Sequence, residues 1–170
     1  MKSWIVLALA IGLAGCALSP ADKPIAQSER EFSQVYDIPG VSKGEIYEGS
    51  LKWIAENFKS AKSVIEYQNP TDGVVIGNGI INYPCSSFEC IGKASWRVKF
   101  TMKLETKDGK FKTEFKNLLI DMPATVSEFG SYPAMEVPIQ LRGDLDAIKP
   151  KLILIGDELK AGLSKKSSDW

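Results

Sequence analysis

The chain of 170 residues contains no histidine, and this absence is its most informative feature. Histidine is the commonest general base of enzymes and a leading metal ligand, and its unperturbed side chain titrates near neutral pH. Hydrolases of the Ser-His-Asp and Cys-His types, His-ligated metal sites and histidine pH switches are therefore excluded. We expect no metal and no cofactor.

An excess of charge of one sign is missing as well, because 21 Lys and Arg face 21 Asp and Glu. A chain without residues 1–15 would lose only Lys2 and carry 20 − 21 = −1. A protein whose positive and negative charges are so nearly equal has no overall electrostatic field that attracts nucleic acid or anionic lipid. We therefore expect no nucleic-acid partner. With 44% hydrophobic and 25% charged residues, the composition is typical of one globular domain.

Long apolar runs are missing except near the N-terminus. Lys2 precedes an apolar run over residues 5–14, which is too short for the ~20 residues that span a bilayer. A basic start, a short apolar core and small residues at its end are typical of a secretory signal. The run ends in Leu-Ala-Gly before Cys16, which resembles the lipobox of bacterial lipoproteins. The alternative is an ordinary secretory signal with a chance cysteine.

The lipoprotein interpretation makes residues 1–15 a signal peptide and Cys16 the site of lipid attachment. The resemblance implies that this cysteine is diacylated and that its new amine is acylated, with palmitate among the acyl chains. More than one acyl chain anchors a protein stably. Ala17 and Leu18 follow the cysteine, and the absence of Asp there favours the periplasmic face of the outer membrane, by resemblance to the sorting rule of enteric bacteria. We expect residues 16–30 to be the lipidated cysteine and a polar, flexible tether.

Only two other cysteines are present, Cys85 and Cys90, with four residues between them. The compartment beyond the inner membrane is oxidising, which favours a disulfide. A redox pair is the alternative, but such pairs normally have two intervening residues and a helix start. We favour a structural disulfide.

Residues 31–163 are predicted to form a single α+β domain, followed by a polar tail over 164–170. The predicted order is β-α-β-β-β-β-α, which suits one antiparallel sheet of about five strands with both helices on one face. Strands are expected at 32–38, 62–68, 74–83, 95–106 and 110–121.

The two helices are indicated by their apolar spacing. Ser42 and Glu45 form a capping box, and apolar residues then recur every three or four positions as far as Phe58. The second stripe contains Pro150, so we expect the regular helix to begin there. Its members are Leu145, Ile148, Leu152, Ile155, Leu159 and Leu163.

The last two predicted strands are joined by Asp108-Gly109, a two-residue hairpin signal. Folding the chain about this turn sets Glu105 opposite Lys112 and Lys103 opposite Glu114, two opposite-charge pairs that support the register. In the preceding strand, Gly77 and Gly79 predict a bulge.

Five short segments combine core and turn residues in a recognisable pattern: residues 41–47, 51–54, 59–65 and 77–80 and the hairpin at 107–110. They resemble the uncharacterised bacterial domain family described as having a TBP-like fold, which is common in exported proteins of Gram-negative bacteria. The resemblance spans about residues 31–121 and implies the fold. It implies no catalytic residue, because none is established for that family.

A binding or interaction module is the first functional hypothesis, with an envelope protein or a glycan as its partner. One candidate surface is the uncovered sheet face, a mildly positive patch that also holds Thr101 and Glu114. The alternative is a solvated face whose charges prevent aggregation. The basic residues of this candidate surface are Arg97, Lys99, Lys103, Lys112 and Lys116.

The second candidate surface lies in residues 122–139, which contain three prolines and read as a long loop. Phe129 and Tyr132 in this loop would anchor a partner if they are exposed. The alternative is that both rings cap the core.

An enzyme is the less favoured hypothesis, and an accessory role in an envelope assembly is the third. Paired carboxylates hydrolyse glycans when they face each other across a cleft. Asp121, Glu128 and Glu136 are the candidates, but no spacing places them together. A deep pocket with facing carboxylates would favour the enzyme, and a flat surface would favour binding.

Overall fold

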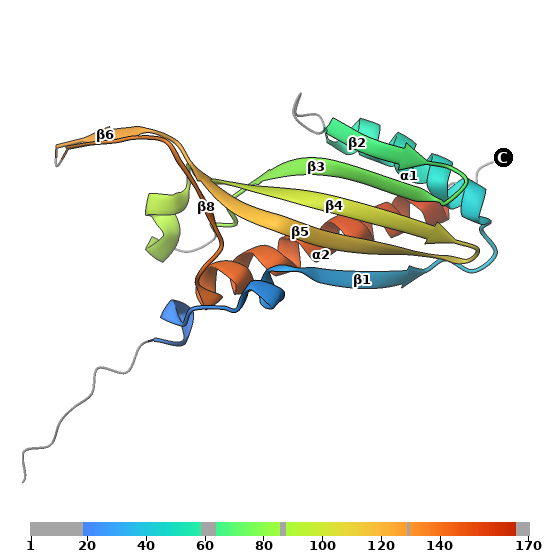
Figure 1. Cartoon of the computed structure of the whole chain (residues 1–170), viewed down its shortest axis with the longest axis horizontal. Helices are drawn as coiled ribbons and strands as arrows, with labels where there is room; N and C mark the ends of the chain where they lie inside the picture. The colour runs from blue at the N-terminus through green and yellow to red at the C-terminus, as the bar shows by residue number, and fades with distance from the viewer. Residues whose placement is uncertain (1–18, 59–63, 86–87, 129, 166–170) are drawn as a thin grey trace, which may run out of the picture.

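The computed structural model describes residues 19–58, 64–85, 88–128 and 130–165 (Figure 1). Short 3-10 turns occur at η1 (Pro20–Asp22), η2 (Gln27–Arg30) and η3 (Phe88–Lys93). The helices are α1 (Lys43–Asn57) and α2 (Arg142–Lys165). The strands are β1 (Phe32–Asp37), β2 (Val64–Asn69), β3 (Val74–Asn82), β4 (Arg97–Lys107), β5 (Lys110–Met122), β6 (Thr125–Ser127), β7 (Gly130–Tyr132) and β8 (Met135–Pro138).

The main sheet is antiparallel, with the strand order β1-β5-β4-β3-β2. Strand β8 also pairs with β5, beyond the part of β5 that β1 covers. Helices α1 and α2 contact each other and the same face of the sheet. The predicted α+β class is therefore confirmed, and within the described residues β8 raises the main sheet from about five strands to six.

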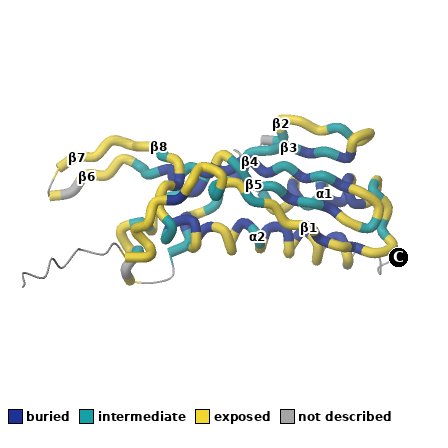
Figure 2. Tube along the Cα trace, turned by 60° about the horizontal axis from the view of Figure 1, so that its bottom comes forward, coloured by how far each residue is buried: buried dark blue, intermediate teal, exposed yellow. Residues whose placement is uncertain are grey.

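The hydrophobic core lies between the two helices and this face of the sheet (Figure 2). On β4 every second side chain from Val98 to Leu104 is buried, and on β5 Phe111 and Phe115 join the same face. This alternation is the one that the sequence predicts.

Helix α1 begins at the predicted capping box. The Ser42 hydroxyl accepts from the amide of Glu45 at 3.3 Å, and the Glu45 carboxylate accepts from the amide of Ser42 at 2.9 Å. These two bonds satisfy amide groups that a helix start leaves without partners. Ile46 and Ile54 face the core, and the small Ser50 between them is completely buried.

Helix α2 begins at Arg142 and runs through Pro150, so the prediction that regular helix starts at the proline is wrong. All six members of the apolar stripe are buried, on both sides of the proline. Pro150 lies on the exposed side, and so does Asp146, whose carbonyl the proline leaves without a helical donor. Water can hydrate that carbonyl, and packing of the stripe keeps the helix continuous.

The β4–β5 hairpin has the predicted register, with Glu105 opposite Lys112 and Lys103 opposite Glu114. Further along, β5 contains one extra residue at Asn117, whose φ is +53°. This bulge shifts the alternation of β5 by one position. As a result Leu118 faces the core. After the bulge the even-numbered residues of β5 face the core, whereas before it the odd-numbered residues do.

The bulge predicted in β3 is not there. The register shift between β2 and β3 falls in β2, between Ile65 and Tyr67. Gly79 has another role, because a Cβ at this position would overlap the ring of Phe100. The glycine gives that ring room in the core.

Residues 19–30, which we call the strap, are packed against the domain and do not form the predicted flexible tether. Ile25 is buried, and its amide donates to the carbonyl of Gln140 at 2.9 Å. Arg142 forms an ion pair with Glu29. The amide of Arg142 also donates to the carbonyl of Lys23 at 2.8 Å, so the strap is fixed to the start of α2.

Residues 123–134, which we call the arm, contain paired strands where a loop was predicted. Strands β6 and β7 pair with each other and project beyond the body of the molecule (Figure 1). The prolines do not prevent this, because Pro123 and Pro133 lie between strands and Pro138 is the last residue of β8. The predicted polar tail over 164–170 starts inside α2, and residues 166–170 lie outside the described residues.

Candidate binding surfaces

The uncovered sheet face carries matched charges, which corrects the predicted positive patch. Arg97 lies 2.7 Å from Asp121, and Lys99 contacts both Asp121, at 3.7 Å, and Glu136. Glu136 belongs to β8, which was not predicted to join this face. Among the described residues only Lys116, of the five predicted basic residues, has no ion pair.

The other cations pair with the acidic residues of the hairpin. Lys103 and Lys112 lie 2.8 and 2.5 Å from Glu105, and Lys112 also lies 3.8 Å from Glu114. Hydrogen bonds from Lys103 and Lys112 lower the pKa of Glu105 to about 2. This half of the face is a compact network of charges that neutralise one another.

A shallow pocket of about 280 Å³ lies at the bulge of β5. Asn117 donates to the Thr101 hydroxyl at 3.2 Å, and that hydroxyl donates to the amide oxygen of Asn78 at 2.8 Å. Asn78 in turn donates to Glu66 on β2. Polar groups thus form a chain across four strands of the uncovered face. The pocket is lined by Asn78, Gly79, Ile80, Lys99, Phe100, Thr101, Asn117 and Leu119.

A buried polar cluster lies at the start of α2, and sequence reasoning missed it. The Tyr83 hydroxyl donates to Asp144 at 2.5 Å, and Lys93 lies 2.5 Å from the same carboxylate oxygen. Lys93 also lies over the ring of Trp96, 5.3 Å from its centre. Burial and the neighbouring Asp144 raise the pKa of Tyr83 well above its usual range.

Two open pockets flank this cluster and share Tyr83 and Pro84 in their walls, with volumes of about 290 and 410 Å³. Each charge of the cluster already has a partner within it. The cluster therefore joins η3 to α2 and leaves no unmatched charge for a ligand. Asp144 in the first helical turn was the one available sequence signal, because acidic residues favour that position.

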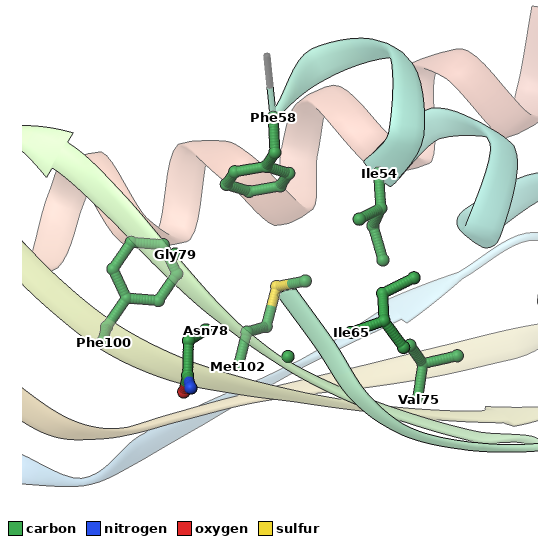
Figure 3. A pocket seen from close by; sticks show the side chains of 9 residues that line it. Ile54, Phe58, Ile65, Val75, Asn78, Gly79, Phe100 and Met102 are labelled. Carbon is green, nitrogen blue, oxygen red and sulfur yellow. The ribbon is translucent and has the colours of Figure 1, made fainter. Parts of the chain in front are cut away.

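The apolar pocket between α1 and strands β2–β4 is small. Figure 3 shows Phe58 and Ile54 above it and Met102 and Val75 below. Its volume is about 20 Å³, which is close to the space of a single water molecule. We regard it as a packing gap of the core.

The arm exposes apolar side chains. Val126 is 86% exposed and Tyr132 is 56% exposed. Tyr132 therefore does not cap the core, whereas Phe129 lies outside the described residues.

The predicted disulfide is present. Cys85 and Cys90 are bonded, with their Cα atoms 5.5 Å apart. We call the described residues 84–85 and 88–93 the disulfide loop, and in it Phe88 is 88% exposed. Cys16 lies outside the described residues.

The three candidate carboxylates do not assemble as a trio. Asp121 lies opposite Glu136 in the β5–β8 pairing, which spacing alone did not predict. Glu128 lies in the turn of the arm, between β6 and β7. Lys99 contacts both Asp121 and Glu136, so the pair belongs to an ion-pair network on an open face.

The described residues contain no helix of sufficient length and hydrophobicity to cross a membrane. They also contain no group of three or more Cys, Asp or Glu arranged to hold a metal ion.

The fold and these surfaces define a class of protein: an α+β domain with two helices on one face of a six-stranded sheet and the other face open. A family model described as "Domain of unknown function (DUF4468) with TBP-like fold" matches residues 32–120. This match covers just over half of the chain, and the protein belongs to that family. The predicted resemblance is confirmed.

Two solved structures share the fold. A DUF4468 family protein from Bacteroides ovatus is 17% identical with a TM-score of 0.53, over 82% of this chain and 86% of that one. A TBP-like protein from Parabacteroides distasonis is 11% identical with a TM-score of 0.62, over 85% of this chain and 97% of that one. No curated protein matches the chain. At these identities the likeness concerns the fold alone.

Proposed function

We propose that this protein is a lipid-anchored binding module of the cell envelope, held by Cys16 at the periplasmic face of the outer membrane. Its ligand is an uncharged, hydroxyl-rich molecule such as a glycan, bound on the uncovered sheet face. The observation that carries this proposal is the polar pocket at the bulge, with its amides of Asn78 and Asn117.

The chemistry of the pocket favours a neutral ligand. Asn117 uses its amide nitrogen toward Thr101, and its amide oxygen has no partner among the described residues. Amides supply both donors and acceptors, which suits ligand hydroxyl groups. Lys99 at the rim is already paired with Asp121 and Glu136, so its charge is neutralised without an anionic ligand.

The size of the pocket limits the ligand. A volume of about 280 Å³ lies at the small end of ligand pockets, which measure ~300–1,000 Å³. The partly exposed Ile80 and Leu119 give the pocket apolar walls. One ring of a longer glycan fits this description, with the rest of the polymer lying along the open face.

Asn117→Gly is the variant that tests the pocket. Glycine adopts a positive φ without strain, so the bulge is retained while the amide is lost. We expect chitotetraose or maltotetraose to raise the melting temperature of the parent protein and to shift NMR signals of the pocket residues. Asn117→Gly should lose both effects, and Gln68→Ala on exposed β2 should keep them. Shifts located elsewhere, or none with either sugar, would contradict the proposal.

The anchor is tested separately by Cys16→Ser. The proposal expects this variant to remain unprocessed or to leave the membrane fraction. Normal cleavage with an unchanged membrane fraction would refute lipid attachment. That result would not alter the sugar titration, which tests the pocket separately.

A further inference from the structure

Exposed apolar side chains are concentrated at one end of the molecule. Nine large apolar side chains of the described residues are prominently exposed, and three of them, Val35, Tyr67 and Leu154, are scattered over the body. The other six belong to the arm, the start of β8, the disulfide loop and the residue before α2, all at the left end in Figure 1. These six are Phe88, Ile91, Val126, Tyr132, Met135 and Leu141.

The arm is also poor in charge. Glu128 is the only charged residue among residues 123–134, in a chain with 25% charged residues. A surface element that exposes apolar groups and carries so little charge is typical of a contact surface.

The strap determines what lies near this end. Its first element, η1, lies at the same left end of the molecule as the arm (Figure 1). The strap is fixed to the domain, because Ile25 is buried and Glu29 forms an ion pair with Arg142. The predicted lipid site, Cys16, precedes Ser19 by three residues, which span at most about 10 Å.

We infer that the arm and the disulfide loop rest in the headgroup layer of the bilayer to which Cys16 anchors the chain. This inference rests on the proposed anchor. A lipid attached within three residues of the strap brings the bilayer to this end of the domain, and the arm is the outermost described element there. The anchor makes the contact intramolecular, so even weak insertion of Phe88 and Val126 is effective.

The depth of the contact is limited by the backbone. Strands β6 and β7 pair only with each other among the described residues, so each has one open edge. Unpaired amide and carbonyl groups are not tolerated in the hydrocarbon core. Tyrosine, with its apolar ring and polar hydroxyl, favours the interface, and Tyr132 is placed accordingly. In this orientation the sheet face remains open to the periplasm.

The test uses the full lipidated protein in vesicles of phosphatidylethanolamine and phosphatidylglycerol. Val126→Trp and Phe88→Trp place a fluorophore at the proposed contact, and Val35→Trp, at an exposed position of β1, is the matched control. The added emission is measured with lipids brominated near the carbonyl and near the chain end. We expect at least twofold stronger quenching for the first two variants than for the control, and stronger quenching by the shallow bromine.

Two results would overturn the inference while leaving the anchor in place. Equal quenching at Val126, Phe88 and Val35 in vesicles that retain the protein would place this end away from the lipid while the anchor still holds. A photo-cross-linker at Tyr132 that joins one envelope protein in cells, and no lipid, would assign the arm to an envelope assembly. Loss of the protein from the vesicles would instead refute the anchor, and the inference with it.

Discussion

The hydroxyl of Tyr83 donates a hydrogen bond of 2.5 Å to the carboxylate of Asp144, 61 residues further along the chain. Both side chains are buried, and Lys93 contacts the same carboxylate oxygen. This contact joins three parts of the fold: the end of β3, the disulfide loop and the first turn of α2. A buried carboxylate requires such partners, because an unpaired charge is costly in the interior.

Tyr83→Phe should lower the free energy of unfolding by about 1–3 kcal/mol at pH 7, because it removes one donor from a buried carboxylate. Burial and Asp144 raise the pKa of Tyr83 above its ordinary 10.0. The contribution of the phenol is therefore complete below pH 10 and is lost as the pH rises further. Urea unfolding of both proteins from pH 7 to 11 measures this.

The difference between parent and variant should shrink above about pH 10. Tyr132→Phe, which alters an exposed ring on the arm, is the control and should leave stability unchanged. A difference that stays constant from pH 7 to 11 would contradict the role given to Asp144.

Glu105→Gln tests the charge network of the open face. Hydrogen bonds from Lys103 and Lys112 hold the pKa of Glu105 at about 2, below its ordinary 4.5. Its contribution is complete above pH 4.5 and is lost as the pH falls toward 2. Because the groups are partly exposed, we expect a loss of only about 1 kcal/mol at pH 7, and less in high salt.

Chemical denaturation at pH 7 and at pH 2 measures the effect, which should be largely lost at the lower value, where Glu105 is about half protonated in the folded protein. Glu48→Gln, on the exposed side of α1 and without an ion pair among the described residues, is the control. A loss for Glu105→Gln that persists at pH 2 would show that packing, and not charge, is responsible.

The correct predictions come from patterns that are local in the chain. The β4–β5 register follows from the turn at Asp108-Gly109 together with charges placed symmetrically about it. The start of α1 follows from Ser42 and Glu45, which are three residues apart. In both cases the residues that determine the structure are the residues that contact each other.

The features that were missed depend on distant contacts. Nothing near Asn117 in the chain marks it as a bulge, because the shift is defined by its partner strand. Ile25 is one apolar residue in a polar segment, and the contacts that fix the strap are with residues more than 100 positions away, Gln140 and Arg142. The cluster of Tyr83 and Asp144 joins segments that share no local pattern.

Pro150→Ala should stabilise the protein. The proline lies on the exposed side of α2 and removes a hydrogen bond to the carbonyl of Asp146. Alanine restores that bond and has the highest helix propensity. Part of this gain is offset, because the unfolded chain has more conformational freedom without the proline. We therefore expect the free energy of unfolding to rise by about 1–2 kcal/mol. Thermal unfolding checks this, and an unchanged or lower melting temperature would mean that the proline is needed for the path of the helix.

Gly79→Ala should be strongly destabilising, because its Cβ would overlap the ring of Phe100. Overpacking of a core typically costs about 1–3 kcal/mol. Gly44→Ala is the matched control, since that helical glycine has open space around it and alanine should stabilise α1 by up to about 1 kcal/mol. Similar losses at the two positions would show that space at Phe100 is not what Gly79 supplies.

The disulfide and Lys93 should act together. Replacing Cys85 and Cys90 by serine opens a loop with a sequence separation of 5, and such a small loop contributes about 2 kcal/mol through the unfolded chain. The same bond holds η3, which carries Lys93 to Asp144. Lys93→Met should cost about 1–2 kcal/mol with the disulfide intact. The same substitution should cost less without the disulfide, because Lys93 then contacts Asp144 only part of the time.

A double-mutant cycle on the unfolding free energy measures this coupling between the disulfide and Lys93, which we expect to exceed about 0.5 kcal/mol. Additive effects would mean that the loop keeps its shape without the bond, so that the disulfide acts on the unfolded chain alone.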